Sequence, residues 1–207
     1  LSDDTMQKIA MENNLSETAF AVKEGVVYRL RWFTPGGEID LCGHATLATA
    51  FVIMNFVEET STQVTFATKS GDLIVRRDEE LYELDFPVAT SKKIDLTDDL
   101  VQALGVEPVE AYVNRDLLLV LESEEAVARL APDMQKLAEI EAGLGVIVTA
   151  QSTDYDFVSR AFFPKLKVNE DPVTGSAHCA LVPFWAERLE QENFLARQLS
   201  ARGGTLH

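Results

Sequence analysis

The chain of 207 residues carries 34 acidic and 18 basic side chains, which gives a net charge of −16, and 46 % of its residues are hydrophobic. This length suits one large domain or two lobes with real cores, and the excess of negative charge argues against binding to nucleic-acid phosphates. The two cysteines, Cys42 and Cys179, are too few for a disulfide framework or a structural zinc site, so we expect a cytoplasmic protein.

The first part of the chain predicts helices and short strands. Asp3, Asp4 or Thr5 can cap a helix that runs to about residue 13. The pattern continues with a hairpin of strands at 18–22 and 26–32, an apolar helix at 46–56, and strands at 63–67, 73–76 and 81–86. Because the helix at 46–56 is apolar on nearly all sides, we expect it to be buried inside its lobe. The apolar stretch around it is too short to span a bilayer, and we expect no membrane partner.

The second part of the sequence predicts a larger set of helices and strands. They are a short helix from 97 to 104, strands at 109–113 and 117–121, one or two amphipathic helices within 124–140, strands at 146–149 and 155–163, and a second buried helix at 175–189. Few parallel crossover patterns occur, so the predicted class is α+β rather than doubly wound. We expect an N-terminal lobe at 1–92 and a C-terminal lobe at 93–207.

A short internal repeat links the two halves. The pattern R-x-F-x-P occurs at 31–35 and again at 160–164. In each copy it is followed by a glutamate and then by a glycine that opens a small-residue apolar segment; these residues are Glu38 and Gly43 in the first copy, and Glu170 and Gly175 in the second. The second copy has a loop three residues longer. The order of shared features predicts two lobes built on one plan and related by a pseudo-twofold axis.

Each repeat places its glycine at the start of a predicted helix. The unpaired N–H groups of a helix N-terminus attract carboxylate or phosphate groups. Two such ends brought together would form a cleft for a small anion, with His44 and Ser176 as additional side-chain donors. The alternative interpretation is that Gly43 and Gly175 form tight turns into core helices and that His44 is an ordinary buried histidine.

Two carboxylates have both a structural and a chemical interpretation. Asp171 lies in the loop before the second helix, where it can cap the helix or accept a hydrogen bond from a substrate amine or hydroxyl. Glu17 opens the first predicted strand and can be a surface glutamate. It can also be a general base for a carbon acid, provided that it lies in a dry pocket.

Cys42 raises the possibility of a racemase, because cofactor-independent racemases can use two opposed cysteines. Its counterpart in the second repeat is Thr174, and Cys179 falls inside the second helix, so the pair is incomplete. The sequence has no G-x-S-x-G, P-loop or HExxH motif and no pair of histidines at ligand spacing. We therefore expect no metal and no cofactor.

Four segments together resemble the PhzF-like family of phenazine-biosynthesis isomerases: NLSETAF at 14–20, RWFTPGGEIDLCGHATLA at 31–48, EDPVTGSA at 170–177 and QLSARGG at 198–204. The resemblance implies a diaminopimelate epimerase-like fold, with two similar lobes that each wrap a β-barrel-like sheet around a helix. It also implies an active site in the cleft between the lobes, and a homodimer. Members usually have an additional strand and a G-N-P-A-A segment before the first helix and further strands after RGG, so the chain looks truncated at both ends.

The founding enzyme of that family isomerises trans-2,3-dihydro-3-hydroxyanthranilate without a cofactor or metal, and a glutamate is thought to move the proton between ring carbons. The resemblance implies that Glu17 is this acid/base. It implies active-site roles for His44, Asp171 and Ser176, which hold the carboxylate and amine of the substrate. The implied substrate-binding positions are Gly43, Ala45, Thr174 and Gly175.

We therefore expect a cofactor-independent isomerase that moves a proton on a small amino- or hydroxy-carboxylate other than the phenazine precursor, because a fold does not fix a function. One alternative is an amino-acid racemase or epimerase that uses Cys42. The other is a non-catalytic relative that binds a small molecule or a protein.

Overall fold

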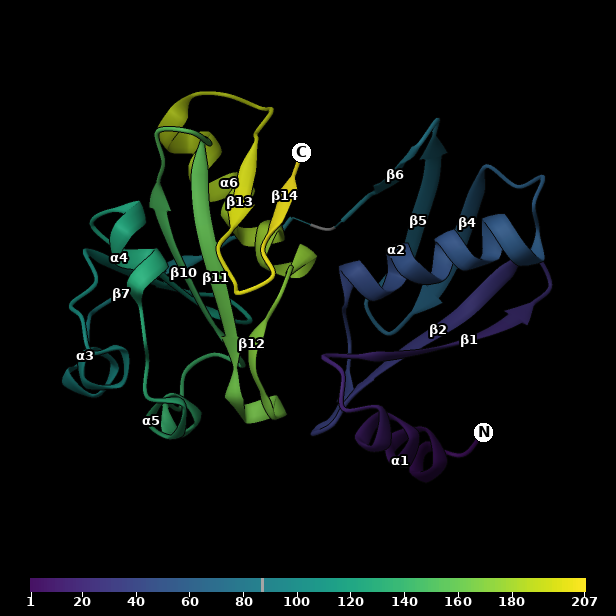
Figure 1. Ribbon diagram of the computed structural model, residues 1–207, viewed down its shortest axis with the longest axis horizontal. Coiled ribbons are helices and arrows are strands. Elements are labelled where there is room, and N and C mark those ends of the chain that lie inside the picture. Colours follow the sequence, from purple (N-terminus) through teal and green to yellow (C-terminus); the bar gives the residue numbers. More distant parts are fainter. Residues whose placement is uncertain (87) are drawn as a thin grey trace. The chain divides into compact units, whose positions relative to one another are not determined.

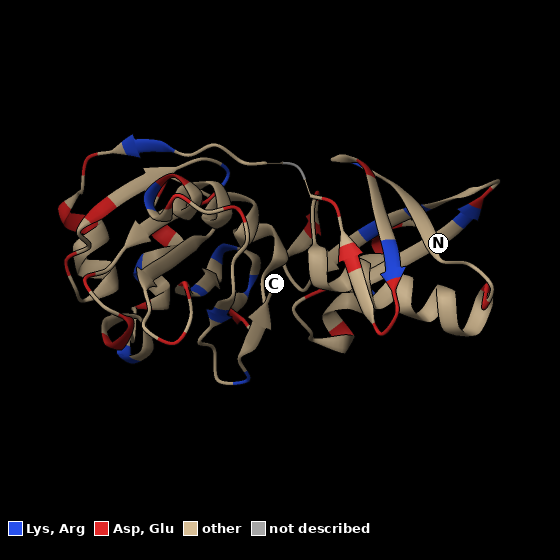
Figure 2. Cartoon of the chain, turned by 90° about the horizontal axis from the view of Figure 1, so that it is seen from above, with Lys and Arg blue, Asp and Glu red and all other residues tan. Residues whose placement is uncertain are grey.

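The computed structural model describes residues 1–86 and 88–207 (Figure 1). The chain forms two compact units, Leu1–Pro87 and Val88–His207. The boundary lies a little earlier than the expected one after residue 92, because β7 (Lys92–Ile94) pairs within the second sheet and the Ala89 N–H donates to the carbonyl of Cys179. Acidic residues lie on helices, strands and loops of both units (Figure 2). None of the helices in the described part of the chain is long and apolar enough to cross a membrane.

The first unit is a mixed sheet with two helices. Its elements are α1 (Asp3–Asn13), β1 (Thr18–Glu24), β2 (Val27–Thr34), β3 (Gly37–Ile39), α2 (Gly43–Val52) with a π-helical turn (Ile53–Val57), β4 (Gln63–Thr68), β5 (Gly71–Asp78) and β6 (Leu81–Leu84). The strand order is β1-β2-β4-β5-β6 with β3 beside β2, and among the described strands of this unit only β2 and β4 pair in parallel. The predicted hairpin and the longer elements are confirmed.

The N-cap of α1 is none of the three expected residues, Asp3, Asp4 or Thr5. Ser2 is the N-cap, and its side chain accepts a hydrogen bond from the Thr5 N–H. Asp3 and Asp4, which had been expected as caps, lie in the first turn, where their charge complements the helix dipole. Asn14 ends the helix in the left-handed conformation, with φ of 49°.

The helix at 46–56, expected to be buried inside its lobe, is buried only in part. One face of the helix, with Ala50 and Met54, packs into the core of the sheet beside residues such as Phe66. Phe51 of α2 and Phe56 of the π-helical turn are 46 % and 69 % exposed. The physical reason is that the described strands form an open path from β1 to β6, so the sheet covers one side of the helix (Figure 1).

The second unit has a larger mixed sheet with helices on both faces. Its elements are β7 (Lys92–Ile94), α3 (Asp98–Leu104), β8 (Glu110–Val113), β9 (Leu117–Val120), α4 (Glu124–Arg129), α5 (Met134–Glu139), β10 (Val146–Gln151), β11 (Phe157–Phe163), a 3-10 turn (Pro164–Leu166), β12 (Val168–Asp171), α6 (Gly175–Leu189), β13 (Ala196–Gln198) and β14 (Gly204–Leu206). The order is β14-β13-β11-β10-β9-β8-β7, with β12 beside β11, and β9–β10 and β11–β13 are parallel pairs.

Alternating residues of β9 pack into two separate hydrophobic cores of the second unit. Leu117 and Leu119 of β9 pack in the core that also holds buried residues of α3, α4 and α5. Leu118 points into the other core, with Phe157 and the α6 residue Trp185. Because both faces of β9 are covered, its sequence is a continuous apolar run instead of an alternating one. The fold class is α+β with two lobes, as expected.

The internal repeat is confirmed in three dimensions. In both copies an antiparallel hairpin is followed by a side strand, a helix, a strand that pairs in parallel with the second hairpin strand, and a last antiparallel strand. These elements are β1-β2-β3-α2-β4-β5 in one unit and β10-β11-β12-α6-β13-β14 in the other. Arg31 donates Nε and Nη2 to Glu38 at 2.7 and 2.9 Å, and Arg160 donates the same atoms to Glu170 at 2.7 and 3.0 Å. The 3-10 turn after β11 accounts for the longer loop of the second copy.

Candidate active site

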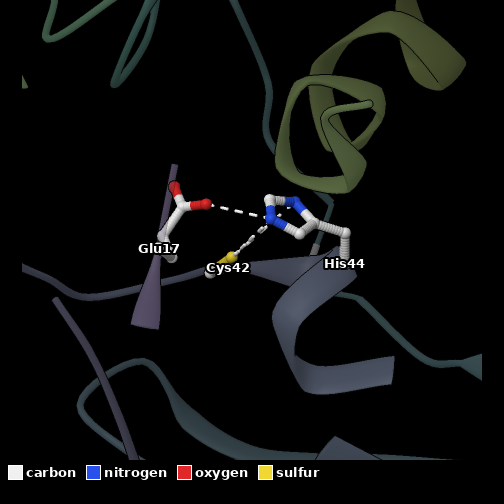
Figure 3. A group of neighbouring side chains, drawn as sticks. All are labelled: Glu17, Cys42 and His44. Carbon is white, nitrogen blue, oxygen red and sulfur yellow. Dashed lines mark hydrogen bonds and ion pairs between the residues drawn. The ribbon is translucent and has the colours of Figure 1, made fainter. Parts of the chain in front are cut away.

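Glu17, Cys42 and His44 meet at the start of α2 (Figure 3). An oxygen of the Glu17 carboxylate lies 3.0 Å from Nε2 of His44, and Sγ of Cys42 lies 4.0 Å from the same nitrogen and 3.9 Å from Nδ1. The Glu17 side chain is only 10 % exposed, so the interpretation of Glu17 as a surface glutamate is wrong. The structure thus brings Glu17 and His44 together, and adds Cys42 to them.

Local backbone structure holds this group in place. Glu17 precedes β1, whose first residue, Thr18, is paired with Phe33 of the central strand β2. Cys42 is the extended N-cap of α2, and the Thr46 hydroxyl donates to its carbonyl at 2.5 Å. His44 is the second residue of the helix and its side chain is 33 % exposed. An outside molecule can therefore reach the group at the imidazole while the carboxylate is shielded.

The two helices that begin at the repeat glycines share an uncommon feature. Their N-caps, Cys42 for α2 and Thr174 for α6, make no side-chain hydrogen bond to the helix start. The four other α-helices of the described residues are capped by the side chains of Ser2, Thr97, Ser123 and Asp133. Uncapped first-turn N–H groups are donors for an anion. Gly43, Ala45, Gly175 and Ser176 contribute to these two first turns.

In the second unit, Asp171, Thr174 and Gln198 meet at the start of α6. Asp171 is 3 % exposed and accepts a 2.6 Å hydrogen bond from the Thr174 hydroxyl. Gln198, which is fully buried, donates to the Asp171 carbonyl at 2.7 Å and accepts from the Thr174 N–H at 2.7 Å. This amide therefore fixes the loop that carries Asp171 and Thr174.

Two residues of this region were not expected from the sequence. Gln198 begins the QLSARGG segment, and that motif was the signal for it. Arg115 donates from Nη2 to the Ser176 hydroxyl at 3.1 Å and pairs with Asp116 at 2.6 Å. No sequence signal marks Arg115, because Ser176 lies far away along the chain and only the fold brings the two together.

Cys179 does not complete a pair of catalytic thiols. It lies inside α6, where burial raises the pKa of its thiol to about 11, so it stays protonated at neutral pH. The neighbouring His178 is also buried, and Nδ1 lies 2.8 Å from the Thr174 carbonyl. Burial lowers the pKa of His178 to about 4, so this imidazole is neutral. Both residues are part of the core.

Comparison with known proteins agrees with this architecture. The sequence matches the family described as phenazine biosynthesis-like protein (PhzC-PhzF) over residues 1–207. A relative from Pseudomonas aeruginosa, named an uncharacterized isomerase, is 52 % identical over 207 residues, which are 100 % of this chain and 79 % of the relative. This chain therefore belongs to the PhzF family of phenazine biosynthesis-like proteins.

Solved structures support the same assignment. A crystal structure of a PhzF-family phenazine biosynthesis protein from Enterococcus faecalis is 54 % identical, with a TM-score of 0.91, and the match covers 100 % of this chain and 79 % of that one. A probable proline racemase from Agrobacterium radiobacter shares the fold with a TM-score of 0.61 at 12 % identity, over 90 % of this chain and 65 % of that one. The second likeness concerns the fold alone.

Proposed function

We propose that the protein is a cofactor-independent isomerase that moves a proton on a small amino- or hydroxy-carboxylate, with Glu17 as the acid/base. The observation that carries the proposal is the shielded Glu17 carboxylate, 3.0 Å from His44 Nε2, beside the uncapped start of α2. Relatives that are 52 % and 49 % identical are named isomerases, which supports the reaction class.

The proposed reaction begins when the Glu17 carboxylate removes a proton from a substrate carbon next to an electron-withdrawing group. The C–H electron pair is delocalised into the substrate, and the first-turn N–H groups of α2 stabilise the negative charge that develops. Glu17 then returns the proton to a different carbon, so the product is an isomer. His44 can hold the carboxylate in position through Nε2 and relay the proton.

We propose that residues of the second repeat bind polar groups of a small carboxylate. The buried Asp171 carboxylate suits a substrate amine or hydroxyl, whereas Ser176 and the N–H groups near Thr174 and Gly175 suit a carboxylate. Arg115 lies beside the Ser176 hydroxyl and adds positive charge for the same carboxylate. The predicted homodimer and cytoplasmic location remain predictions.

The experiment is solvent exchange followed by proton NMR in D₂O, with a panel of cyclic and linear amino acids and hydroxy acids. We expect deuterium to enter one compound, and Glu17→Gln to slow this exchange by about 10²–10⁴-fold, which is the usual contribution of a general base. Glu12→Gln, which changes an exposed glutamate of α1, is the matched control and should exchange at the wild-type rate.

The same assay distinguishes the two alternatives. The proximity of Cys42 Sγ to the His44 ring favours an epimerase as the second candidate. In that case Cys42→Ser abolishes exchange while Glu17→Gln retains it. If no compound exchanges but one of them binds, the proposal of an isomerase is overturned in favour of a non-catalytic relative.

A further inference from the structure

The group at the start of α2 also has the composition of a metal site. Glu17, Cys42 and His44 each offer one ligand atom, and these three atoms lie within 4.8 Å of one another. Thiolate sulfur, imidazole nitrogen and carboxylate oxygen are the ligands that zinc takes in proteins. We propose that this cluster reversibly binds one Zn²⁺ ion and that the bound ion inhibits the enzyme.

The distances fit a tetrahedral ion with little movement. Zinc bonds of about 2.0–2.3 Å at tetrahedral angles separate neighbouring ligand atoms by about 3.3–3.6 Å. In the structure, His44 Nε2 is 3.0 Å from the Glu17 oxygen and 4.0 Å from the Cys42 sulfur. These two separations lie on either side of the required range, and the third, between the Glu17 oxygen and the Cys42 sulfur, is within 4.8 Å, so binding needs only adjustments of about 1 Å.

Burial and charge favour capture of a cation. Cys42 is 4 % exposed and the Glu17 side chain 10 %, so water competes weakly for these two ligands. The His44 side chain is 33 % exposed and provides the entry point. The net charge of −16 raises the local concentration of cations around the molecule. Three protein ligands leave the fourth position of a tetrahedral ion for water, as in zinc sites with an open position.

The expectation of no metal rested on spacing along the sequence, which does not reveal this cluster. Cys42 and His44 come from the start of α2, whereas Glu17 precedes β1. Inhibition follows because the bound ion uses lone pairs of Glu17 and His44, which makes the coordinated carboxylate a far weaker base toward a substrate C–H group. The inhibition rests on the proposed function, whereas the binding of zinc does not.

The binding test uses the full chain after treatment with a chelator. Titration with Zn²⁺ against a chromogenic chelator should give one site per chain. Co²⁺ in its place should give intense visible bands typical of four-coordination and a near-ultraviolet sulfur-to-cobalt charge-transfer band. Cys42→Ser should abolish that band and weaken zinc binding by at least about 100-fold, since even outer-shell partners contribute about 10–100-fold to affinity.

Cys179→Ser is the matched control, because it removes the other buried cysteine and should keep both the band and the affinity. Glu17→Gln and His44→Gln should each weaken zinc binding, which guards against a folding defect in a single variant. Zinc affinity that is unchanged in Cys42→Ser and Glu17→Gln would overturn the proposal, as would a cobalt spectrum without the charge-transfer band.

The inhibition test adds Zn²⁺ to the exchange assay and then a chelator. Exchange should stop at one equivalent of zinc and return on chelation. If zinc binds with the cobalt signature but exchange continues, the metal site stands and its inhibitory role is overturned, whereas the assignment of Glu17 as the base is decided by the exchange rate of Glu17→Gln without zinc. The two failures are therefore distinguishable.

Discussion

His178 shows how strongly the environment of one residue decides its chemistry. The imidazole is stacked on Phe157, with ring centroids 5.9 Å apart, and its Nδ1 faces the Thr174 carbonyl. Because a carbonyl only accepts hydrogen bonds, Nδ1 carries the proton and Nε2 is bare. Nε2 is buried and has no hydrogen-bond partner among the described residues. A second proton at Nε2 would therefore be a buried, unpaired charge, which explains the lowered pKa.

We predict that His178 makes stability depend on pH between 6.5 and about 4. Between these pH values His178 is protonated in the unfolded state, where its pKa is 6.5, but stays neutral in the folded state, where its pKa is about 4. The free energy of unfolding therefore falls as the pH falls. The free energy of unfolding, measured with urea, should drop by about 2 kcal/mol from His178 between pH 7.5 and pH 5.

The control for this prediction is His178→Asn, whose amide can still donate to the Thr174 carbonyl. Its stability should change less over the same pH range, because the titrating group is absent. Equal slopes for the wild type and the variant would show that His178 is already accessible to protons in the folded state.

At the scale of elements, an arginine–glutamate pair joins the hairpin to the side strand in both repeats. The two arginines differ in their burial and in their additional hydrogen-bond partners. The Arg160 side chain is 13 % exposed and also donates to the carbonyls of Val127 and Leu130 at 3.2 and 2.6 Å. The Arg31 side chain is 24 % exposed, and its additional partner, Asp3, is 77 % exposed. The hydrogen bonds from Arg31 lower the pKa of Glu38 to about 2.

We predict that Arg160→Gln lowers the free energy of unfolding more than Arg31→Gln does. The expected losses are about 3 and about 1 kcal/mol, because Arg160→Gln also removes the side-chain donor of the Leu130 carbonyl, whereas the additional partner of Arg31 is the exposed Asp3, and exposed pairs contribute little. Urea unfolding of both variants measures the difference, with Arg129→Gln on the exposed face of α4 as the control. Equal losses in the two variants would contradict the argument.

The longer elements could be predicted from the sequence because each has its own pattern. The segment 175–189 opens with glycine and remains apolar, and it forms α6 with the expected bounds. The strands β3, β13 and β14 have three residues each, which is too few for a periodicity, and they form only because a neighbouring strand is present. The exposed face of α2 was missed since hydrophobicity alone does not reveal how far a sheet extends.

The candidate site was predictable only in part. The internal repeat directed attention to His44 and Ser176, and the family resemblance directed it to Glu17. These residues could therefore be named from the sequence. The proximity of Cys42 Sγ to His44 and the contact of Arg115 with Ser176 depend on side-chain placement in the folded protein. The pairing of His44 with Glu17 also depends on the position of β1 beside β2, which no local pattern specifies.

At the scale of the whole molecule, the dominant property is the net charge of −16. Acidic residues are spread over both units, so they repel one another in the folded state (Figure 2). Exposed ion pairs such as Lys8 with Asp4 oppose this repulsion weakly, because water screens them. Long-range repulsion should therefore outweigh the exposed pairs at low ionic strength.

We predict that moderate salt stabilises the protein. Raising NaCl from about 10 mM to about 150 mM shortens the Debye length from about 30 Å to about 8 Å and screens the repulsion between distant carboxylates. The melting temperature, followed by circular dichroism, should rise by a few degrees, and KCl should give the same shift. A fall in melting temperature would show that ion pairs such as Arg31 with Glu38 dominate instead.

The duplication also separates two kinds of chemistry on one frame. The same hairpin, arginine–glutamate pair and helix that begins with glycine occur twice. The residues on either side of the glycine differ: they are Cys42 and His44 in one copy, and Thr174 and Ser176 in the other. A thiol and an imidazole can carry protons, whereas two hydroxyls only donate and accept hydrogen bonds. In the proposed function, the first copy therefore supplies the proton-transfer groups and the second supplies hydrogen-bonding groups for the substrate, so one repeated arrangement of elements serves two different tasks.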